Sequence, residues 1–292
     1  MISINAPAKI NLYLHITGRR LDGYHLIDSL VAFADISDKI AVSSASNLSL
    51  KVSGPFADNL RSANNLVTKA AKLLALHNGF KQGAALHLTK NLPVASGVGG
   101  GSADAAATLL ILCRHWDLSL PHNVLFQIAG QLGADVPVCL QGQASFVGGV
   151  GNEITLAPGL PEGWLVLVNP GIPVPTPQVF ERHAGAFSKS SRFDQMPNNI
   201  SELAALLRER TNDLTEAAMT VAPIIGDTIK ALDGCRGALL TRLSGSGGTC
   251  FALFEHENDA KEAGNALTKR KPNWWVRAAP LLTKWPSIAE HN

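Results

Sequence analysis

The stretch that decides the fold is NLPVASGVGGGSADAAATLLILC, residues 91–113, where four glycines fall between positions 97 and 101 just before a helix-forming apolar run. The preceding segment, residues 84–92, alternates apolar and polar side chains as a half-buried strand does. A strand, a glycine loop and a helix opening at Ser102 or Asp104 together form an anion site, because N–H groups and the helix dipole face outward. Phosphate is the expected ligand of such a site, although glycines also permit a tight turn with no ligand.

Spacing limits which phosphate loop this is. A P-loop requires GxxxxGK[ST], and no lysine lies inside or just after the glycines. A dinucleotide fingerprint requires GxGxxG, but counting from Gly97 and Gly99 the sixth position is Ser102. What remains is the pattern PxxxGxGGGSxxA, which begins at Pro93. In this loop a side chain at Gly100 is expected to point at the phosphates.

The rest of the chain predicts a mixed α/β protein of two lobes. Alternating apolar positions predict strands in the first lobe, at residues 9–16, 38–44, 47–53, 143–149 and 153–157. Helical spacing predicts helices at 64–80, which ends at Asn78-Gly79, and at 105–116 and 121–134. We expect a lobe boundary near residue 155, dividing the chain into 1–155 and 156–292. The second lobe is expected to hold a strand at 164–168, helices within 200–210, 213–232 and 260–270, and a strand, glycine turn and strand at 238–254.

Composition excludes several classes of function. There are 25 Lys and Arg against 23 Asp and Glu, a formal charge of +2 without a long basic run, so nucleic acid is not the expected partner. Four scattered cysteines form no metal pattern and indicate reduced, mostly buried thiols. The N-terminus lacks the signature of a signal peptide, and the apolar run at 105–113 is too short to cross a bilayer. A cytoplasmic protein without a membrane partner is expected.

Three motifs resemble those of the GHMP kinases, the superfamily of galactose, homoserine, mevalonate and phosphomevalonate kinases. PVASGVGGGSADAA resembles their second, ATP-binding motif, APAKINLYLHITGRRLDGYH the first, and LSGSGGTCFALF the third. LGADVPVCLQG and TPQVF also match, in type and order, a branch of the superfamily whose acceptor alcohol carries a cytidine diphosphate group. The resemblance runs from Ala6 to about Phe254. Departures at Val98, Ala103 and Gly248 remove no side chain with an assigned chemical role.

This resemblance implies the two-lobed GHMP kinase fold, of class α/β (α+β), with a ribosomal-protein-S5-like N-terminal lobe and a ferredoxin-like C-terminal lobe. It implies an ATP-dependent kinase that acts on a small-molecule alcohol with Mg²⁺. Asp135 of GADVP matches the general base of the family, and Lys9 of PAK matches the lysine beside it. Taken alone, Asp135 would suit a turn or helix cap, and a lysine in a strand would suit a solvated face.

The resemblance also implies the binding residues. Cytosine would lie between Tyr24 and Phe180 with His25 at its edge, although Phe180 alone could be a core residue and His25 a surface histidine. Asn11 would line the diphosphate side, Asn65 the adenine site, and Ser102 would help to place Mg²⁺. The glycine loop would surround the phosphates of ATP with Pro93, Gly97, Gly99, Gly100, Gly101 and Ser102. The third motif would close the site with Gly245, Ser246 and Gly247.

Three rival functions remain open at this stage. A sibling GHMP kinase could act on a mevalonate- or homoserine-type alcohol. An RNA-binding module is conceivable because the N-terminal lobe of the family resembles a ribosomal protein domain, although the absence of a basic stripe disfavours it. A catalytically dead homologue is disfavoured by the intact Lys9 and Asp135.

Overall fold

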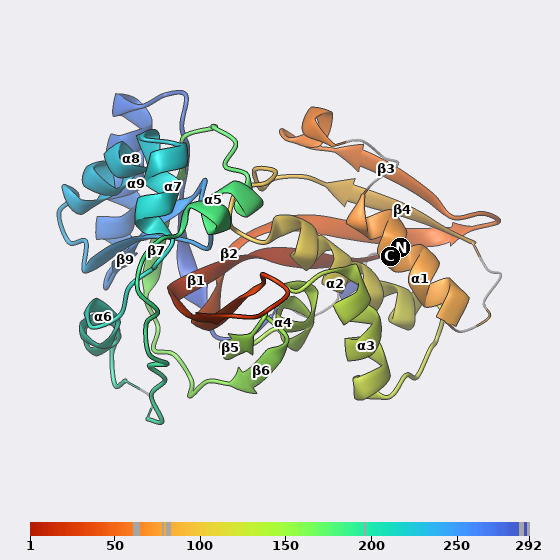
Figure 1. Cartoon of the computed structure of the whole chain (residues 1–292). Helices are drawn as coiled ribbons and strands as arrows, with labels where there is room; N and C mark the ends of the chain where they lie inside the picture. Colours follow the sequence, from red (N-terminus) through yellow and green to blue (C-terminus); the bar gives the residue numbers. More distant parts are fainter. Residues whose placement is uncertain (61–64, 78, 80–82, 196, 286–288, 291–292) are drawn as a thin grey trace.

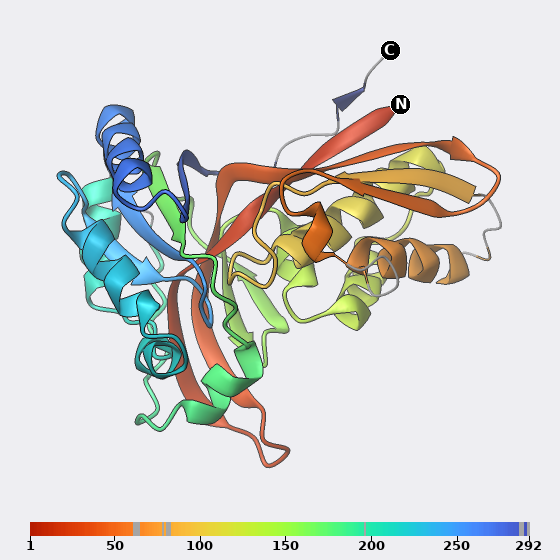
Figure 2. The same ribbon diagram turned by 90° about the horizontal axis from the view of Figure 1, so that it is seen from above.

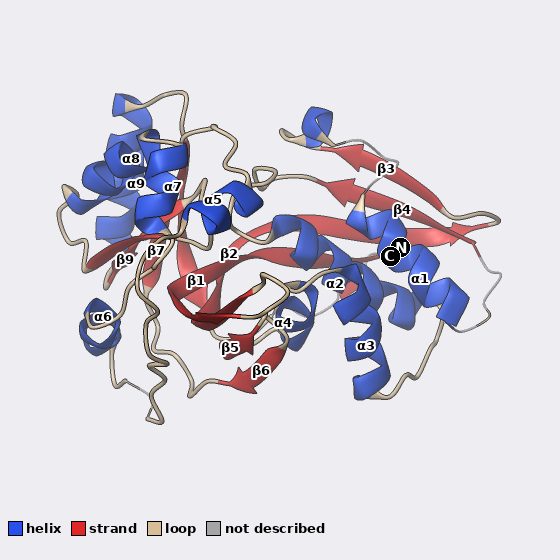
Figure 3. Ribbon diagram, in the orientation of Figure 1, coloured by secondary structure: helices blue, strands red, loops and turns tan. Residues whose placement is uncertain are grey.

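The computed structural model of the chain describes residues 1–60, 65–77, 79, 83–195, 197–285 and 289–290. In this part of the chain helices and strands are mixed, and they gather into two lobes that lie side by side (Figures 1 and 3). The mixed α/β class expected from the sequence is therefore confirmed. No helix among the described residues is long and apolar enough to span a bilayer.

Two long antiparallel strands, β1 (Ile2–Arg19) and β2 (His25–Ala45), form the frame of the molecule. Eighteen residues of strand reach about 60 Å, enough to run past both lobes (Figure 2). The register slips between Pro7 and Ala8, between Asn11 and Tyr13, and between Ile16 and Gly18. Such bulges bend a strand and redirect its side chains, and the middle one lies in the site described below.

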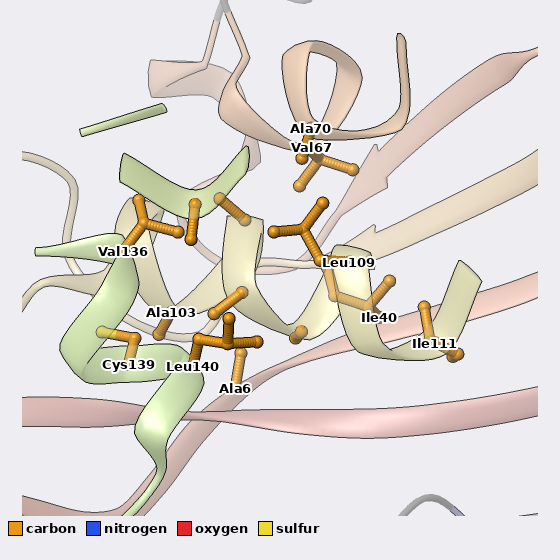
Figure 4. Packing of buried hydrophobic residues seen from close by; sticks show 14 of the residues in the cluster. Ala6, Ile40, Val67, Ala70, Ala103, Leu109, Ile111, Val136, Cys139 and Leu140 are labelled. Atoms are coloured by element: carbon orange, nitrogen blue, oxygen red, sulfur yellow. The ribbon is translucent and has the colours of Figure 1, made fainter. Parts of the chain in front are cut away.

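The first lobe extends the sheet from β2 with short strands, two of which pair with β2 and two with those strands, and covers the sheet with helices. The strands are β3 (Ser49–Ser53), β4 (Gly83–Thr89), β5 (Ser145–Gly149) and β6 (Glu153–Leu156). The helices are η1 (Ala57–Asn59), α1 (Leu66–His77), α2 (Gly100–His115), α3 (His122–Leu132) and α4 (Val136–Gln141). α2 lies at the centre of this lobe. Its alanines let α1, α4 and the sheet approach closely, as the packing around Ala103 and Leu109 illustrates (Figure 4).

The second lobe is a smaller sheet faced by helices. Its strands are β7 (Trp164–Asn169), β8 (Leu240–Leu243), β9 (Cys250–Phe254) and β10 (Trp275–Leu282). Its helices are α5 (Thr176–Arg182), α6 (Ile200–Arg208), α7 (Thr215–Val221), α8 (Ile224–Asp233) and α9 (Glu257–Arg270). Pro223 divides the apolar stretch 213–232 into α7 and α8, because proline cannot donate the hydrogen bond that a continuous helix needs there.

The strand β10 joins the two lobes. It pairs with β7 along most of its length and with Ala34 and Phe33 of β2 at its end. With β11 (Ala289–Glu290) included, the sheet runs in the order β11-β1-β2-β10-β7-β9-β8. The short β11 pairs with the start of β1. The last part of the chain thus returns to the sheet of the first lobe.

Candidate active site

A cleft of about 1370 Å³ lies between the lobes. This volume exceeds the usual range for a single small-molecule ligand, so there is room for a nucleotide and a second substrate. Of the site residues expected from the sequence, those lining the cleft are Lys9, Asn11, Tyr24, His25, Asn65, Pro93, Gly97, Gly99, Gly100, Gly101, Ser102, Asp135, Phe180, Gly245 and Ser246.

The centre of the cleft holds an ammonium and a carboxylate in contact. Lys9 Nζ lies 3.1 Å from Asp135 Oδ2, and Lys9 also donates to Asn11 Oδ1 at 2.9 Å. The Lys9 side chain is only 5% exposed, whereas that of Asp135 is 48% exposed. Asp135 immediately precedes α4, but its side chain makes no capping hydrogen bond. Its carboxylate is therefore free to act on a molecule in the cleft.

The glycine loop follows a path that side chains would block. A Cβ on Gly97 would lie 2.4 Å from the Gly247 carbonyl oxygen, and one on Gly99 would lie 2.9 Å from Lys9 Cε. Both residues have positive φ, +79° and +59°, which glycine adopts without strain. α2 then begins at Gly100, so the expected start at Ser102 or Asp104 was wrong by at least two residues. The loop residues and the first turn of α2 face the cleft, as an anion site requires.

The expectation that a side chain at Gly100 meets the phosphates stays a prediction, and the structure adds a protein neighbour, because a Cβ on Gly100 would also face a buried cation. This Cβ would lie 3.0 Å from Lys90 Nζ, a cation held between the Asp38 and Asp104 carboxylates. All three side chains are buried, and Asp38 also accepts from the main-chain N–H of Leu92 at 2.8 Å. Burial raises the pKa of Asp104; the Lys90 ammonium opposes this rise and Asp38 adds to it. This ionic cluster fixes the floor of the glycine loop.

Gly100→Val is therefore expected to destabilise the fold. The valine would crowd the locked Lys90 ammonium, and overpacking of this kind typically lowers the free energy of unfolding by about 1–3 kcal/mol. Thermal unfolding checks the change. Gly130→Val is the matched control, since a Cβ on that exposed residue of α3 meets no atom within 4 Å. A Gly100→Val protein of normal stability that has lost only nucleotide affinity would show that this position contacts the ligand directly.

Aromatic side chains gather at the far end of the cleft, beside the tip of the β1–β2 hairpin. The rings of His25 and Phe180 lie 5.4 Å apart, and His183 packs edge-on against His25 at 6.0 Å. Tyr24 is 67% exposed, which leaves its ring free to contact a ligand. Burial, together with the positive charge of Arg19 and the neighbouring His183, lowers the pKa of His25. Its neutral imidazole offers one donor and one acceptor.

Asn65 uses one of its two side-chain polar atoms within the protein and leaves the other unpaired. Its Oδ1 accepts from the main-chain N–H of Val67 at 2.9 Å, which caps the start of α1. Its Nδ2 is buried without a hydrogen-bond partner although the residue lines the cleft. An unsatisfied buried donor is costly, so this atom is well suited to an acceptor on a ligand.

The third motif, between β8 and β9, joins the other two. Ser244 Oγ donates to Gly97 O at 3.0 Å and accepts from Asn11 N at 3.2 Å, so a hydroxyl of the second lobe links β1 to the glycine loop. Ser246 contacts Thr176 Oγ1 at 2.8 Å. Gly247 is not among the residues that line the cleft, and a Cβ on it would lie 3.2 Å from Val174 Cγ1. Its position suits close backbone packing against Gly97.

Comparisons with known proteins agree with this geometry. Family models described as the GHMP kinases N terminal domain and the GHMP kinases C terminal match residues 65–143 and 189–273. A 4-diphosphocytidyl-2-C-methyl-D-erythritol kinase of Paramagnetospirillum magneticum is 48% identical over 281 residues, which cover 96% of this chain and 99% of that protein. A protein of the same name from Rhodospirillum rubrum is 46% identical over 95% of this chain and 91% of its own length.

Solved structures show the same likeness. The crystal structure of a 4-(cytidine 5'-diphospho)-2C-methyl-D-erythritol kinase superposes with a TM-score of 0.79 at 32% identity and covers 96% of this chain and 98% of its own. The homoserine kinase of Cytophaga hutchinsonii superposes with a TM-score of 0.73 at 18% identity, over 99% of this chain and 96% of its own, a likeness of fold alone.

Proposed function

We propose residue-level roles for this cleft on the premise that the chain belongs to the 4-diphosphocytidyl-2-C-methyl-D-erythritol kinases, a family of the GHMP kinases. It is an ATP-dependent small-molecule kinase of isoprenoid biosynthesis. The acceptor we assign is the 2-hydroxyl of the erythritol unit. The observation that most supports these roles is the Lys9–Asp135 pair, half open to the cleft and beside the glycine loop.

In the proposed reaction Asp135 acts as the general base. Its carboxylate takes the proton of the acceptor hydroxyl as that oxygen bonds to the γ-phosphorus of ATP and the bond to ADP breaks. Such transfers pass through a loose transition state, so positioning and charge stabilisation dominate catalysis. The buried Lys9 ammonium holds the carboxylate in place at 3.1 Å and stabilises negative charge that develops on the acceptor oxygen.

We assign the nucleotide to the side of the cleft formed by the loop and α1. The glycine-lined path and the N-terminus of α2 fit a chain of phosphates, and the unpaired Asn65 Nδ2 fits an acceptor on adenine. Mg²⁺ is generally bound by one or two protein oxygens together with substrate phosphates, and it neutralises charge during transfer. Ser102, in the first turn of α2, is the residue we assign to it.

We assign the cytosine of the acceptor to the aromatic end of the cleft. Tyr24 and Phe180 would stack on its two faces, and the neutral His25 would pair with its polar edge. Asn11, which faces the centre of the cleft, would contact the diphosphate side.

Removing one of the stacking rings tests this assignment. Because base stacking on an aromatic contributes about 1–3 kcal/mol per base, Phe180→Ala is expected to raise KM for the cytidylyl substrate roughly 5- to 150-fold, with a smaller fall in kcat. Phe187→Ala, at an exposed phenylalanine outside the cleft lining, is the control. Steady-state kinetics with free CDP as a competing ligand provide the readout. An unchanged KM in Phe180→Ala would rule out the cytosine site.

One assay decides between this function and its rivals. A coupled measurement of ADP release is expected to show turnover with the cytidylyl substrate and none with mevalonate or homoserine. Turnover of either of those alcohols at a comparable rate would instead favour the sibling kinases. We also propose a cytoplasmic location and no nucleic acid partner, since Cys113, Cys139, Cys235 and Cys250 are free thiols and the formal charge is only +2.

A further inference from the structure

A chain of hydrogen bonds runs from Lys9 through Asn11 and Ser29 to the main-chain carbonyl oxygen of Tyr13. This carbonyl oxygen determines the direction of every bond in the chain. Ser29 Oγ lies 2.6 Å from the Tyr13 carbonyl oxygen and 2.8 Å from Asn11 Nδ2. A carbonyl oxygen can only accept, so the Ser29 hydroxyl must donate to it. Its lone pair then faces Asn11, which must present its NH₂ group.

The orientation of the Asn11 amide determines which of its two polar atoms, Oδ1 or Nδ2, faces Lys9 Nζ. With Nδ2 bound to Ser29, Oδ1 faces Lys9 Nζ at 2.9 Å and accepts from the ammonium. In the opposite orientation the amide NH₂ would face an ammonium that has no lone pair to offer. The Lys9 ammonium would lose this partner and the restraint that holds it 3.1 Å from Asp135.

Backbone geometry keeps Ser29 out of reach of the substrates. The register between β1 and β2 slips between Asn11 and Tyr13, which brings both residues to the same serine. Ser29 is completely buried and is not among the residues that line the cleft. A role in the reaction must therefore pass through Asn11.

We infer that Ser29 is a positioning residue for phosphoryl transfer: it fixes the Asn11 amide and, through it, the Lys9 ammonium. This inference rests on the proposed roles of Lys9 and Asp135. It predicts that loss of the hydroxyl impairs the transfer step more than the binding of either substrate, because Ser29 acts through Asn11 alone and the other groups that bind the substrates remain in place.

The first test is Ser29→Ala, assayed by steady-state kinetics with ATP and the cytidylyl substrate. Since small misplacements of reacting groups cost up to about 100-fold in rate, kcat is expected to fall roughly 10- to 100-fold, with both KM values within about threefold. Ser145→Ala is the matched control. Ser145 lies on β5, which pairs with β2; like Ser29 it is fully buried and its hydroxyl donates to a main-chain carbonyl oxygen, that of Gln143. It should retain normal kcat.

A second pair of variants separates the hydroxyl from the shape of the side chain. Ser29→Thr and Ser29→Val place side chains of nearly equal volume at the same buried position, and only the first keeps a hydroxyl. The threonine variant is expected to exceed the valine variant in kcat by about 10-fold or more. Equal kcat values for these two variants would overturn the inference even if Ser29→Ala folds poorly.

Double-mutant cycles identify the route by which Ser29 acts. In an Asn11→Ala or a Lys9→Met background, Ser29→Ala is expected to lower kcat by less than about threefold further. A full Ser29→Ala penalty in those backgrounds would show a general structural role and overturn the inference.

If Lys9→Met alone kept normal turnover, the catalytic role of Lys9 would fail as well. Loss of turnover in Lys9→Met but not in Ser29→Ala would refute only the inference about Ser29.

Discussion

Asp135→Asn is expected to lower kcat roughly 10²- to 10⁴-fold, the usual span for a general base, while nucleotide affinity changes little. The amide has nearly the shape of the carboxylate but cannot take the proton of the acceptor hydroxyl. The Asp135 side chain makes no capping hydrogen bond to α4, so its replacement should leave the fold intact. Single-turnover and steady-state rates, with nucleotide affinity measured by calorimetry, check both parts of this expectation.

The control for this experiment is Asp117→Asn. Asp117 is exposed, lies outside the cleft lining and adopts a φ of 51°, a conformation that asparagine also tolerates. It should retain wild-type rates. Near-normal turnover in Asp135→Asn would refute the assignment of the base, and another group would have to accept the proton.

Local patterns in the sequence predicted most of the secondary structure, because periodicity reports which face of an element is buried. Residues 38–44 alternate and lie in β2, residues 49–53 of the expected strand at 47–53 form β3, and the apolar stretch at 105–115 lies in α2. The expected end of the first helix at Asn78-Gly79 concerns Asn78, which lies outside the described residues; Gly79 has a φ of +61°, as a helix C-cap would. The division at residue 155 remains a proposal.

Elements with weak local signals were not predicted. β10 contains Pro280, which argues against a strand in the sequence but is accommodated in its pairing with Trp164 of β7. α4 and α5 have six and seven residues, too few for helical periodicity to show. These short elements nevertheless position Asp135 and Phe180, which only the family motifs identified.

The residues that hold the site together could not be predicted from the sequence at all. Ser244 binds Asn11 across 233 positions of sequence, and Lys90 binds Asp38 across 52. A serine just after β8 and a lysine just after β4 suit solvent as well as they suit these partners. Only the tertiary fold shows that both side chains are buried.

Replacing Lys9 with methionine is the second large-effect prediction. Methionine has a similar length and is apolar, so it should fit a side chain that is 5% exposed and flanked by buried strand residues. It removes the charge that orients Asp135 and stabilises the acceptor oxygen. Loss of one such stabilising group typically lowers kcat by about 10²- to 10³-fold, and that is the expected result.

Lys39→Met provides the control, since Lys39 is an exposed lysine on β2 opposite Asn5 of β1. It removes the same charge from the protein without changing the cleft, and its kcat should stay within about twofold of wild type. A fall in kcat for Lys39→Met that matches Lys9→Met would show that the effect reflects net charge or folding.

The double variant Lys9→Met with Asp135→Asn shows whether the two residues act as a unit. If Lys9 works by holding and polarising the base, its charge has little left to act on once the carboxylate is gone, so the double variant should be no more than about 10-fold slower than Asp135→Asn. Two independent groups would instead multiply their effects to about 10⁴-fold or more. Rates that multiply in this way would show that Lys9 acts on the acceptor oxygen or on the phosphates of ATP and not through Asp135, and the 3.1 Å contact between Lys9 and Asp135 would then not be the feature that activates the acceptor.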